Sequence, residues 1–264
     1  MTRDLDGVDV TLPAARRADL VRHLRSRRHA TVYGLARVFG VSRDTIRRDL
    51  DYLNEHGLVT RTHGGAVIAQ DLIGLTQPFS RRRGQHVEAK DRIARLAASL
   101  VADGETILIS GGTTTLAVGM VLGERRELTI VTNNLPLPRE LPPECYRYVY
   151  VLGGQYRPES LSTFGGLQLP GVHGISADRA IVGCGGLGPA GLSVAAPEDA
   201  SIVFEMLRAA RQRVLVVDSS KFNRDAFAHA AALTDIQSLV TDAEPDRPLR
   251  EALEKAGVEV LVAP

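Results

Sequence analysis

The sequence has few of the features that mark secreted, membrane or disulfide-rich proteins. Its 264 residues include only two cysteines, Cys145 and Cys184, which are far apart and not in CxxC spacing. They predict neither a metal site nor a disulfide framework, and a reducing cytoplasm is the expected location. No apolar run reaches the length of a membrane helix, and the acidic start MTRDLDGVDV lacks the apolar core of a signal peptide. We therefore expect no signal peptide and no membrane partner.

Catalytic and metal-binding motifs are also scarce. The sequence contains no GxSxG elbow, no HExxH pair and no paired-cysteine ligand spacing, and its seven histidines are scattered. The run GGTTT at residues 111–115 is not a P-loop, because no lysine follows the second glycine at the required spacing. We expect a protein that is not an enzyme and that holds neither a metal nor a cofactor.

Positive charge is concentrated near the N-terminus. The whole chain has a net charge of +1, but residues 10–68 carry eleven arginines against five acidic residues, a balance of +6. The remainder therefore carries −5. A basic N-terminal unit joined to a mildly acidic body predicts that only the N-terminal unit binds a polyanion.

The stretch VSRDTIRRDL, residues 41–50, predicts a recognition helix. Ser42 is a typical N-cap, since its hydroxyl can accept the free backbone N–H groups of the first turn. Ile46, Leu50 and Leu53 recur at spacings of four and three and so share one buried face. The opposite face is polar, and a short helix of this kind fits the DNA major groove. The polar face consists of Asp44, Thr45, Arg47, Arg48 and Asp51.

Two predicted helices precede this stretch. One runs from about residue 13 to 28, and a short one follows the cap Thr31, with Leu35, Val38 and Phe39 facing inward and Gly40 at its end. The order of helix, short helix, glycine turn and helix is that of a helix-turn-helix.

The segment LVTRTHGGAVI, residues 58–68, predicts a hairpin with its turn at Gly64-Gly65, which makes a wing after the recognition helix. Residues predicted to contact DNA lie on the helix and on the wing. They are Ser42, Arg43, Thr45, Arg47, Arg48, Arg61 and His63. A solvated basic surface is the alternative for the arginine pair alone, but the cap, the helix order, the wing and the charge balance agree on DNA binding.

We expect four segments along the chain. Residues 1–12 lack a helical period and form a disordered lead, and residues 13–68 form the winged helix-turn-helix. Residues 69–87, with Pro78 and an arginine run ending at Gly84, form a linker. Residues 88–264 form a second domain, which the family resemblance given below implies to be effector-sensing.

The second half alternates apolar strands with helices, which indicates a parallel α/β sheet. Expected helices cover residues 88–101, 114–122 and 198–210. The apolar runs that predict strands, most of them counted together with the glycine or small polar residues that end them, are 106–110, 128–134, 148–155, 179–186, 213–221 and 238–242. Ligands of such sheets bind beyond the carboxyl ends of the strands, where these loops fall.

The predicted ligand site, which the family resemblance given below implies to be an effector site, is a glycine- and threonine-lined crevice at that edge. Glycines allow close backbone approach, and hydroxyls with helix N-terminal amides can hold a phosphate. The alternative for each loop is an ordinary strand-to-helix turn, and for the lysine a solvated side chain. The predicted residues are Gly111, Gly112, Thr113, Thr114, Thr115, Asn133, Gly153, Gly154, Gly185 and Lys221.

Several of these motifs together resemble one family. The stretches VSRDTIRRDL and DYLNEHGLVTRTHGGAV are similar to the winged helix-turn-helix of DeoR-type bacterial transcription regulators. The stretches AKDRIARLAASLVADGETI, GGTTT, VTNN, VLGG and VDSSK followed by Phe222 resemble their sensor domain, in the same order. The resemblance covers roughly residues 13–264.

The resemblance implies a fold of class α/β, with a small N-terminal winged helix-turn-helix followed by a sensor domain like ribose-5-phosphate isomerase and CoA transferases. It implies a regulator, commonly a repressor, of carbohydrate or related catabolic genes. The expected partners are double-stranded operator DNA and a phosphorylated sugar or derivative. A homo-oligomer, dimer or tetramer, is expected because specific regulators gain from symmetric half-sites.

The sequence departs from the family pattern at two places. Ser110-Gly111 stands where the family often has Asp-Ser, and Val203 stands near the position of a frequent lysine. The rival interpretation is a sugar-phosphate isomerase fused to a DNA-binding module, which needs a general base. Its candidates are Asp103, Asp218 and Glu198. A third interpretation, an architectural DNA binder, predicts no sequence preference.

Overall fold

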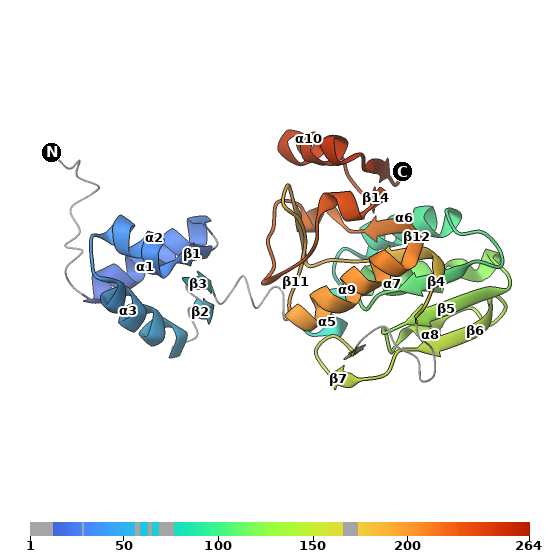
Figure 1. The fold of residues 1–264 in the computed structure, drawn as a ribbon, viewed down its shortest axis with the longest axis horizontal. Coiled ribbons are helices and arrows are strands. Elements are labelled where there is room, and N and C mark those ends of the chain that lie inside the picture. The colour runs from blue at the N-terminus through green and yellow to red at the C-terminus, as the bar shows by residue number, and fades with distance from the viewer. Residues whose placement is uncertain (1–12, 28, 56–58, 63–64, 69–76, 166–173) are drawn as a thin grey trace. The chain divides into compact units, whose positions relative to one another are not determined.

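The computed structural model describes residues 13–27, 29–55, 59–62, 65–68, 77–165 and 174–264. The chain divides into two compact units, residues 1–76 and 77–264 (Figure 1). The lead predicted for residues 1–12 lies outside the described residues.

The first unit consists of helices and one small sheet. Strand β3 is central in the order β1-β3-β2 and pairs antiparallel with both neighbours. The helix-turn-helix and the hairpin were predicted, whereas β1 was not. The elements are α1 (Pro13–Arg27), β1 (His29–Thr31), α2 (Val32–Phe39), α3 (Arg43–Glu55), β2 (Val59–Thr62) and β3 (Gly65–Ile68).

The core of this unit forms where the apolar stripes of the three helices meet. Leu20 and Leu24 of α1 and the predicted inward residues of α3 are at most 2% exposed. The prediction was wrong for Val38, which is 61% exposed, while Val32 is buried in its place. Helix α2 begins directly after its cap Thr31, whose hydroxyl accepts the Gly34 N–H at 3.0 Å. Val38 then lies about 100° around the helix from Phe39, away from the buried stripe.

The wing turn also differs from the prediction. Thr62 pairs with Gly65, so Gly65 lies in β3 and not in the turn. The two residues between this pair, 63 and 64, lie outside the described residues.

The second unit is built on a seven-stranded sheet of order β15-β14-β12-β9-β4-β5-β6. Every neighbouring pair is parallel, as predicted. The strands are β4 (Thr106–Ile109), β5 (Leu128–Thr132), β6 (Tyr146–Val151), β9 (Ala177–Val182), β12 (Ala210–Val216), β14 (Ser238–Thr241) and β15 (Glu259–Val262).

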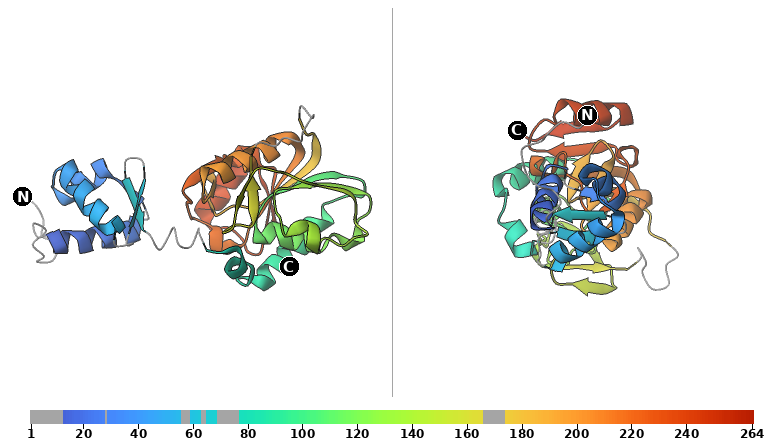
Figure 2. Two further views of the ribbon diagram at one scale, coloured as in Figure 1. Left: turned by 90° about the horizontal axis from the view of Figure 1, so that it is seen from below. Right: turned by 90° about the vertical axis from the view of Figure 1, so that its left-hand side faces the viewer.

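Helices cover both faces of this sheet (Figure 2). Successive residues point to opposite faces, so Leu108 packs in the cluster with α9 and α10, while Ile107 and Ile109 pack in the cluster with α5 to α8. The helices are α5 (Phe79–Arg83), α6 (Val87–Ser99), α7 (Thr113–Met120), α8 (Leu137–Glu140), α9 (Pro197–Ala209) and α10 (Arg247–Ala256). Three short 3-10 helices are η1 (Leu122–Glu124), η2 (Ser219–Lys221) and η3 (Leu233–Asp235).

Two small antiparallel sheets follow strands of the main sheet. One has the order β10-β11-β13, and the other is the hairpin β7-β8. Sequence periodicity did not predict them, because their strands have three or four residues each. They are β7 (Gln155–Arg157), β8 (Ser162–Phe164), β10 (Gly186–Gly188), β11 (Gly191–Val194) and β13 (Ala228–Ala231).

The predicted linker, residues 69–87, extends too far into the second unit. Phe79 of α5 is 2% exposed and packs in the cluster formed with α6 and α7. Its backbone N–H donates to the Glu159 carbonyl at 2.8 Å. Residues 77–87 therefore belong to the second unit, and residues 69–76 lie outside the described residues.

Candidate functional site

The N-terminus of α3 is capped as predicted. The Thr45 N–H donates to Ser42 Oγ at 3.1 Å, and the two hydroxyl oxygens lie 2.9 Å apart. A satisfied cap fixes the residue at which the helix begins. The residue at which α3 begins determines which of its side chains lie on the exposed face.

The arginines of α3 differ in their availability. Arg47 pairs with Asp44 at 2.9 Å, one turn away on the exposed surface. Arg43 and Arg48 are also exposed, and neither forms a side-chain hydrogen bond or ion pair within the described residues. Unpaired guanidinium groups can fork onto phosphate or onto guanine in the major groove. Arg43 and Arg48 are therefore the more available of the three.

Asp49 lies on the opposite face of α3 and is only 2% exposed. Its two carboxylate oxygens accept from Arg16 Nε at 2.6 Å and from Arg17 Nε at 2.9 Å. The Arg17 guanidinium also lies over the Tyr52 ring, 3.7 Å from the centroid. Arg16 and Arg17, which contribute to the positive charge of the N-terminal unit, thus join α1 to α3. The signal in the sequence was an acid within the apolar stripe, since a buried carboxylate needs a partner.

The predicted wing contacts stay predictions. The backbone of Arg61 pairs with Ala66 in the β2-β3 hairpin, which places Arg61 on the wing. His63 lies outside the described residues.

At the carboxyl edge of the large sheet, the loops after β4 and β5 are hydrogen-bonded to each other. Asn133 accepts the Gly111 N–H at 2.7 Å through Oδ1 and donates to the Thr163 carbonyl at 3.0 Å through Nδ2. The Asn134 side chain donates to the Gly112 carbonyl at 2.9 Å. Both asparagines are at most 2% exposed, so they shape the loops.

The three threonines of GGTTT have different surroundings. Thr115 is fully buried and donates to the Ser110 carbonyl at 2.7 Å, and Thr113 is also buried, whereas Thr114 is partly exposed. The first main-chain bond of α7 runs from Leu116 N–H to the Gly112 carbonyl. The N–H groups of residues 113–115 precede it and have no acceptor within the described part of the chain. Such free amides at a helix N-terminus suit an anion.

Gly153 and Gly154 were both predicted to line the crevice, yet their surroundings differ. Gly154 has φ +124°, and a Cβ there would lie 2.0 Å from the Phe164 carbonyl oxygen. Nothing lies within 4 Å of a Cβ on Gly153. Gly154 therefore has a structural role, the close approach of its backbone to β8.

This contrast gives a testable pair of substitutions. Gly154→Ala is expected to destabilise the second unit by about 1–3 kcal/mol, because the left-handed backbone is strained and a fixed carbonyl must move. Gly153→Ala is expected to leave the melting temperature of that unit almost unchanged. Thermal unfolding followed by circular dichroism checks both. Equal melting temperatures for the two variants would contradict the structural role of Gly154.

The loop after β12 supplies the basic rim of the crevice. Asp218 caps η2 by accepting the Ser220 N–H at 3.2 Å, and the Asp242 carboxylate accepts the Ser219 N–H at 2.7 Å. Lys221 is partly buried, and its side chain forms no hydrogen bond or ion pair with other described residues. An unpaired lysine on this rim is suited to an anionic group.

Lys90 of α6 is a buried lysine of the second unit that was not predicted as a site residue. It is 6% exposed. Burial lowers the pKa of Lys90; the Asp218 carboxylate opposes this shift, while the charges of Lys221 and Arg82 add to it. The spacing of Lys90 to Ile93, Ala94 and Ala97 was the available signal, since these alanines and the isoleucine are buried.

Two family models match the chain. A DeoR C-terminal sensor domain matches residues 85–243, and a DeoR-like helix-turn-helix domain matches residues 16–71. The chain belongs to the DeoR family. The prediction of a DNA-binding transcription regulator, with a helix-turn-helix followed by an α/β sensor domain, is thereby confirmed.

Curated relatives of this DeoR-family chain include named repressors. The HTH-type transcriptional repressor GlcR of Bacillus subtilis (strain 168) is 31% identical over 239 residues, covering 90% of this chain and 92% of the relative. The transcriptional repressor AccR of Agrobacterium fabrum is 32% identical, covering 86% and 88%. The glycerol-3-phosphate regulon repressor of Escherichia coli (strain K12) is 30% identical, covering 86% and 89%.

Solved structures resemble the chain only distantly. Ribose 5-phosphate isomerase A of Methanocaldococcus jannaschii is 17% identical with a TM-score of 0.35, covering 52% of this chain and 55% of its own. The eIF2B beta subunit of Chaetomium thermophilum is 14% identical with a TM-score of 0.41, covering 86% and 66%. The DeoR assignment is independent of both.

The departure from the DeoR pattern at Ser110 has a structural counterpart. Ser110 is 1% exposed, and its Oγ accepts the Gly183 N–H at 3.1 Å. It thus joins the loop after β4 to the loop after β9.

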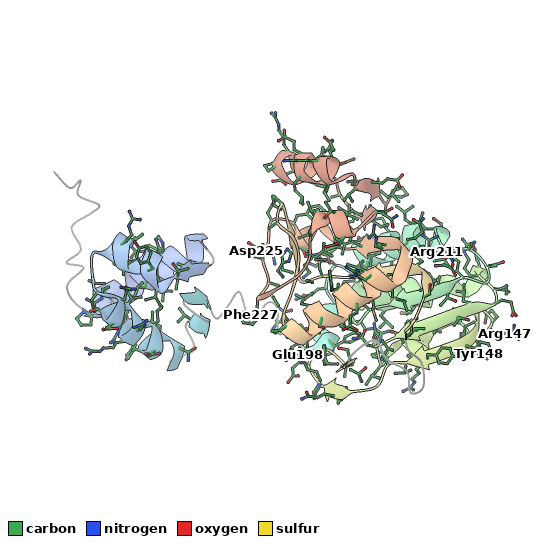
Figure 3. The ribbon with its side chains drawn as sticks, in the orientation of Figure 1. Arg147, Tyr148, Glu198, Arg211, Asp225 and Phe227 are labelled. Atoms are coloured by element: carbon green, nitrogen blue, oxygen red, sulfur yellow. The ribbon has the colours of Figure 1, made fainter. Side chains whose placement is uncertain are left out.

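The isomerase hypothesis named three acidic residues as candidate general bases. The structure places them in different parts of the second unit, and each carboxylate has a hydrogen-bond or ion-pair partner. Asp103 precedes β4, at the amino edge of the sheet, and accepts the Arg126 N–H at 2.9 Å. Asp218 caps η2. Glu198 lies in the first turn of α9 (Figure 3) and pairs with Arg157 at 3.1 Å.

The two cysteine thiols are not activated as nucleophiles. Burial raises the pKa of the Cys145 thiol to about 11 and that of Cys184 to about 12, so both thiols are protonated at neutral pH. Within the described ranges, no group of three or more His, Cys, Asp or Glu side chains is arranged to hold a metal ion. None of the helices described is long and apolar enough to cross a membrane.

Proposed function

We propose that this DeoR-family regulator represses transcription by placing α3 in operator DNA and that a phosphorylated sugar or derivative controls the binding. The observation that supports this most directly is the capped α3 with unpaired, exposed Arg43 and Arg48. Relatives similar over most of their length carry the name repressor.

On the DNA side, we assign different roles to the predicted residues. Arg43 and Arg48 contact phosphate or base edges, and Arg47 joins them once its surface pair with Asp44 opens, because such pairs are weak. Thr45 and Ser42 orient the start of the helix, and phosphate at that N-terminus benefits from the helix dipole. Arg61 and His63 add contacts from the wing.

On the effector side, the phosphate is proposed to lie against the first turn of α7. The free amides of residues 113–115, the Thr114 hydroxyl and the Lys221 ammonium supply donors and charge. Gly111, Gly112, Gly153 and Gly185 line the approach. One relative is named for the glycerol-3-phosphate regulon, and glycerol 3-phosphate belongs to the proposed ligand class.

A double substitution tests the effector site. Thr114→Ala combined with Lys221→Ala is expected to abolish release from the operator by a sugar phosphate and to keep the affinity for DNA in its absence. Fluorescence anisotropy of labelled operator, titrated with a panel of sugar phosphates, measures both. Val38→Ala, on the surface of the first unit, is the control. Normal release by the double variant would contradict the site.

We further propose a dimer or tetramer assembled through the second units. One small module gives limited affinity, whereas two half-sites read by a symmetric dimer multiply it. The effector must then bind the DNA-competent and DNA-incompetent arrangements with different affinities, by about 1–3 kcal/mol for several-fold control. Light scattering coupled to size-exclusion chromatography, with and without ligand, tests the assembly.

A further inference from the structure

Strand β6 lies at one edge of the large sheet and pairs only with β5 among the described strands (Figure 1). The Leu152 N–H donates to the Thr132 carbonyl of β5 at 2.8 Å. Because the main-chain groups of successive strand residues point alternately to the two sides of the strand, those of Val149 and Val151 point away from β5. Within the described ranges these groups form no hydrogen bond. The outer side of β6 is thus an open row of main-chain donors and acceptors.

The side chains along this open edge are apolar and aromatic. Tyr148, Tyr150 and Val151 are between 41% and 49% exposed. Tyr148 and Tyr150 are two residues apart on one face of the strand, and their ring centroids lie 6.3 Å apart. Figure 3 labels Tyr148 at this margin of the sheet. Val149 points to the other face, where it packs against the cluster formed with α5 to α8.

Natural edge strands usually carry a feature that prevents pairing with another chain, such as a lysine, a proline, a charge or a bulge. The run YVYVL, residues 148–152, contains no lysine, proline or charged residue. The register shift between β5 and β6 falls before this run, at Leu128/Thr129. The opposite edge strand, β15, begins at the exposed Glu259 and contains no aromatic residue. The edge at β6 is therefore the one suited to pairing.

We infer that two copies of this chain pair through β6, antiparallel, about a two-fold axis at Tyr150. The inference rests on the proposed assembly through the second units. In this register Val149 faces the partner's Val151, and the two exchange main-chain hydrogen bonds through the groups that point away from β5. Tyr150 faces the partner's Tyr150 at a non-hydrogen-bonded position, where side chains are closest. The two large sheets join into one continuous sheet.

A second copy fits this edge because the pairing is self-complementary. A two-fold axis presents the same surface from both copies, so each residue of the run has an equivalent neighbour. The run is uncharged, so two copies meet without repulsion, and it offers no charge by which an acidic or basic partner would be selected. Aromatic pairs and pairs of β-branched residues are among the cross-strand pairs that stabilise a sheet. The same axis supplies the symmetry with which a dimer reads two half-sites.

Cysteine crosslinking in the full-length protein tests the register. Tyr150→Cys is expected to form a disulfide between two copies, because facing Cα atoms at a non-hydrogen-bonded position are about 4.5 Å apart and disulfides span about 4.4–6.8 Å. Tyr148→Cys is the matched control, since the two copies of residue 148 would lie four positions apart, about 14 Å. The native thiols of Cys145 and Cys184 are protonated at neutral pH and do not compete. Equal crosslinking of the two variants would overturn the register.

The oligomeric state tests the interface itself. Tyr150→Lys places two ammonium groups opposite each other at the axis and is expected to raise the dissociation constant between copies by at least about thirtyfold, the effect of losing one interface hot spot. Analytical ultracentrifugation should then show half the mass of the unsubstituted protein. Tyr156→Lys changes a similarly exposed tyrosine on β7 and is expected to keep the assembly. The crosslink decides the inference if Tyr150→Lys fails to fold.

The outcomes separate this interface from the proposed assembly. An unsubstituted protein that is monomeric at micromolar concentration would contradict both. An oligomer that Tyr150→Lys leaves intact, and that Tyr150→Cys does not crosslink, would keep the assembly through the second units and overturn the pairing of β6.

Discussion

Asp49→Ala is expected to unfold the DNA-binding unit at temperatures where the sensor domain stays folded. The substitution removes the acceptor of both Arg16 and Arg17 from a site where Asp49 is 2% exposed. Removing one partner of a buried ion pair costs about 3–5 kcal/mol, because the other partner loses the opposite charge that stabilised it. A small domain has only about 5–15 kcal/mol of stability in total.

Thermal unfolding measured by calorimetry should show this as a large downward shift of one transition, with DNA binding lost in parallel. Asp44→Ala is the matched control, because it removes a carboxylate from the same helix but breaks only the exposed pair with Arg47. Its expected effect on stability is within about 1 kcal/mol. Similar losses for the two variants would show that burial of Asp49 does not decide its contribution.

Arg48→Ala is expected to weaken operator binding and to leave the fold intact. Arg48 is exposed, and its side chain has no partner within the described residues, so its removal breaks no internal contact. Loss of an arginine contact to a base is expected to reduce the affinity by about 1–3 kcal/mol, and loss of a phosphate contact should also reduce the salt dependence. The dissociation constant for operator DNA obtained by in vitro selection, measured at two salt concentrations, distinguishes a base contact from a phosphate contact.

Two controls make the result specific to α3. Arg22→Ala removes the same charge from an exposed position of α1, where Arg22 pairs with Asp19, and should change affinity little. Arg47→Ala is expected to have a smaller effect than Arg48→Ala, because Arg47 must first leave Asp44. An unchanged dissociation constant for Arg48→Ala would remove Arg48 from the DNA interface.

Local patterns predicted the recognition helix correctly because each signal acts within a few residues. The cap at Ser42 depends on an N–H three residues away, and the inward face of α3 depends on helical spacing alone. The parallel sheet was predictable for a similar reason, since strands buried on both faces must be continuously apolar.

The same reasoning failed where a long-range contact decided the outcome. Strand β1 exists because His29 to Thr31 pair with β3, more than thirty residues later. The role of α5 was missed because its sequence is basic, and Phe79 is buried only through packing with distant helices. Spacing placed Asn133 and Thr115 correctly at the carboxyl edge. Their polar atoms are nevertheless used within the protein, because Asn133 joins two loops and Thr115 bonds to the Ser110 carbonyl of its own loop.

The amino-acid sequence by itself thus determined the order of the two domains, the start and faces of α3, and the edge of the sheet at which the candidate effector loops gather. These depend on periodicity, caps and strand polarity, which are local. Only the tertiary structure decided which charged groups are free and which are held. Arg16, Arg17 and Arg48 are indistinguishable as residues of a basic segment, and burial against Asp49 separates them. Lys90 is distinguished from a solvated lysine in the same way, by the carbonyls of α5.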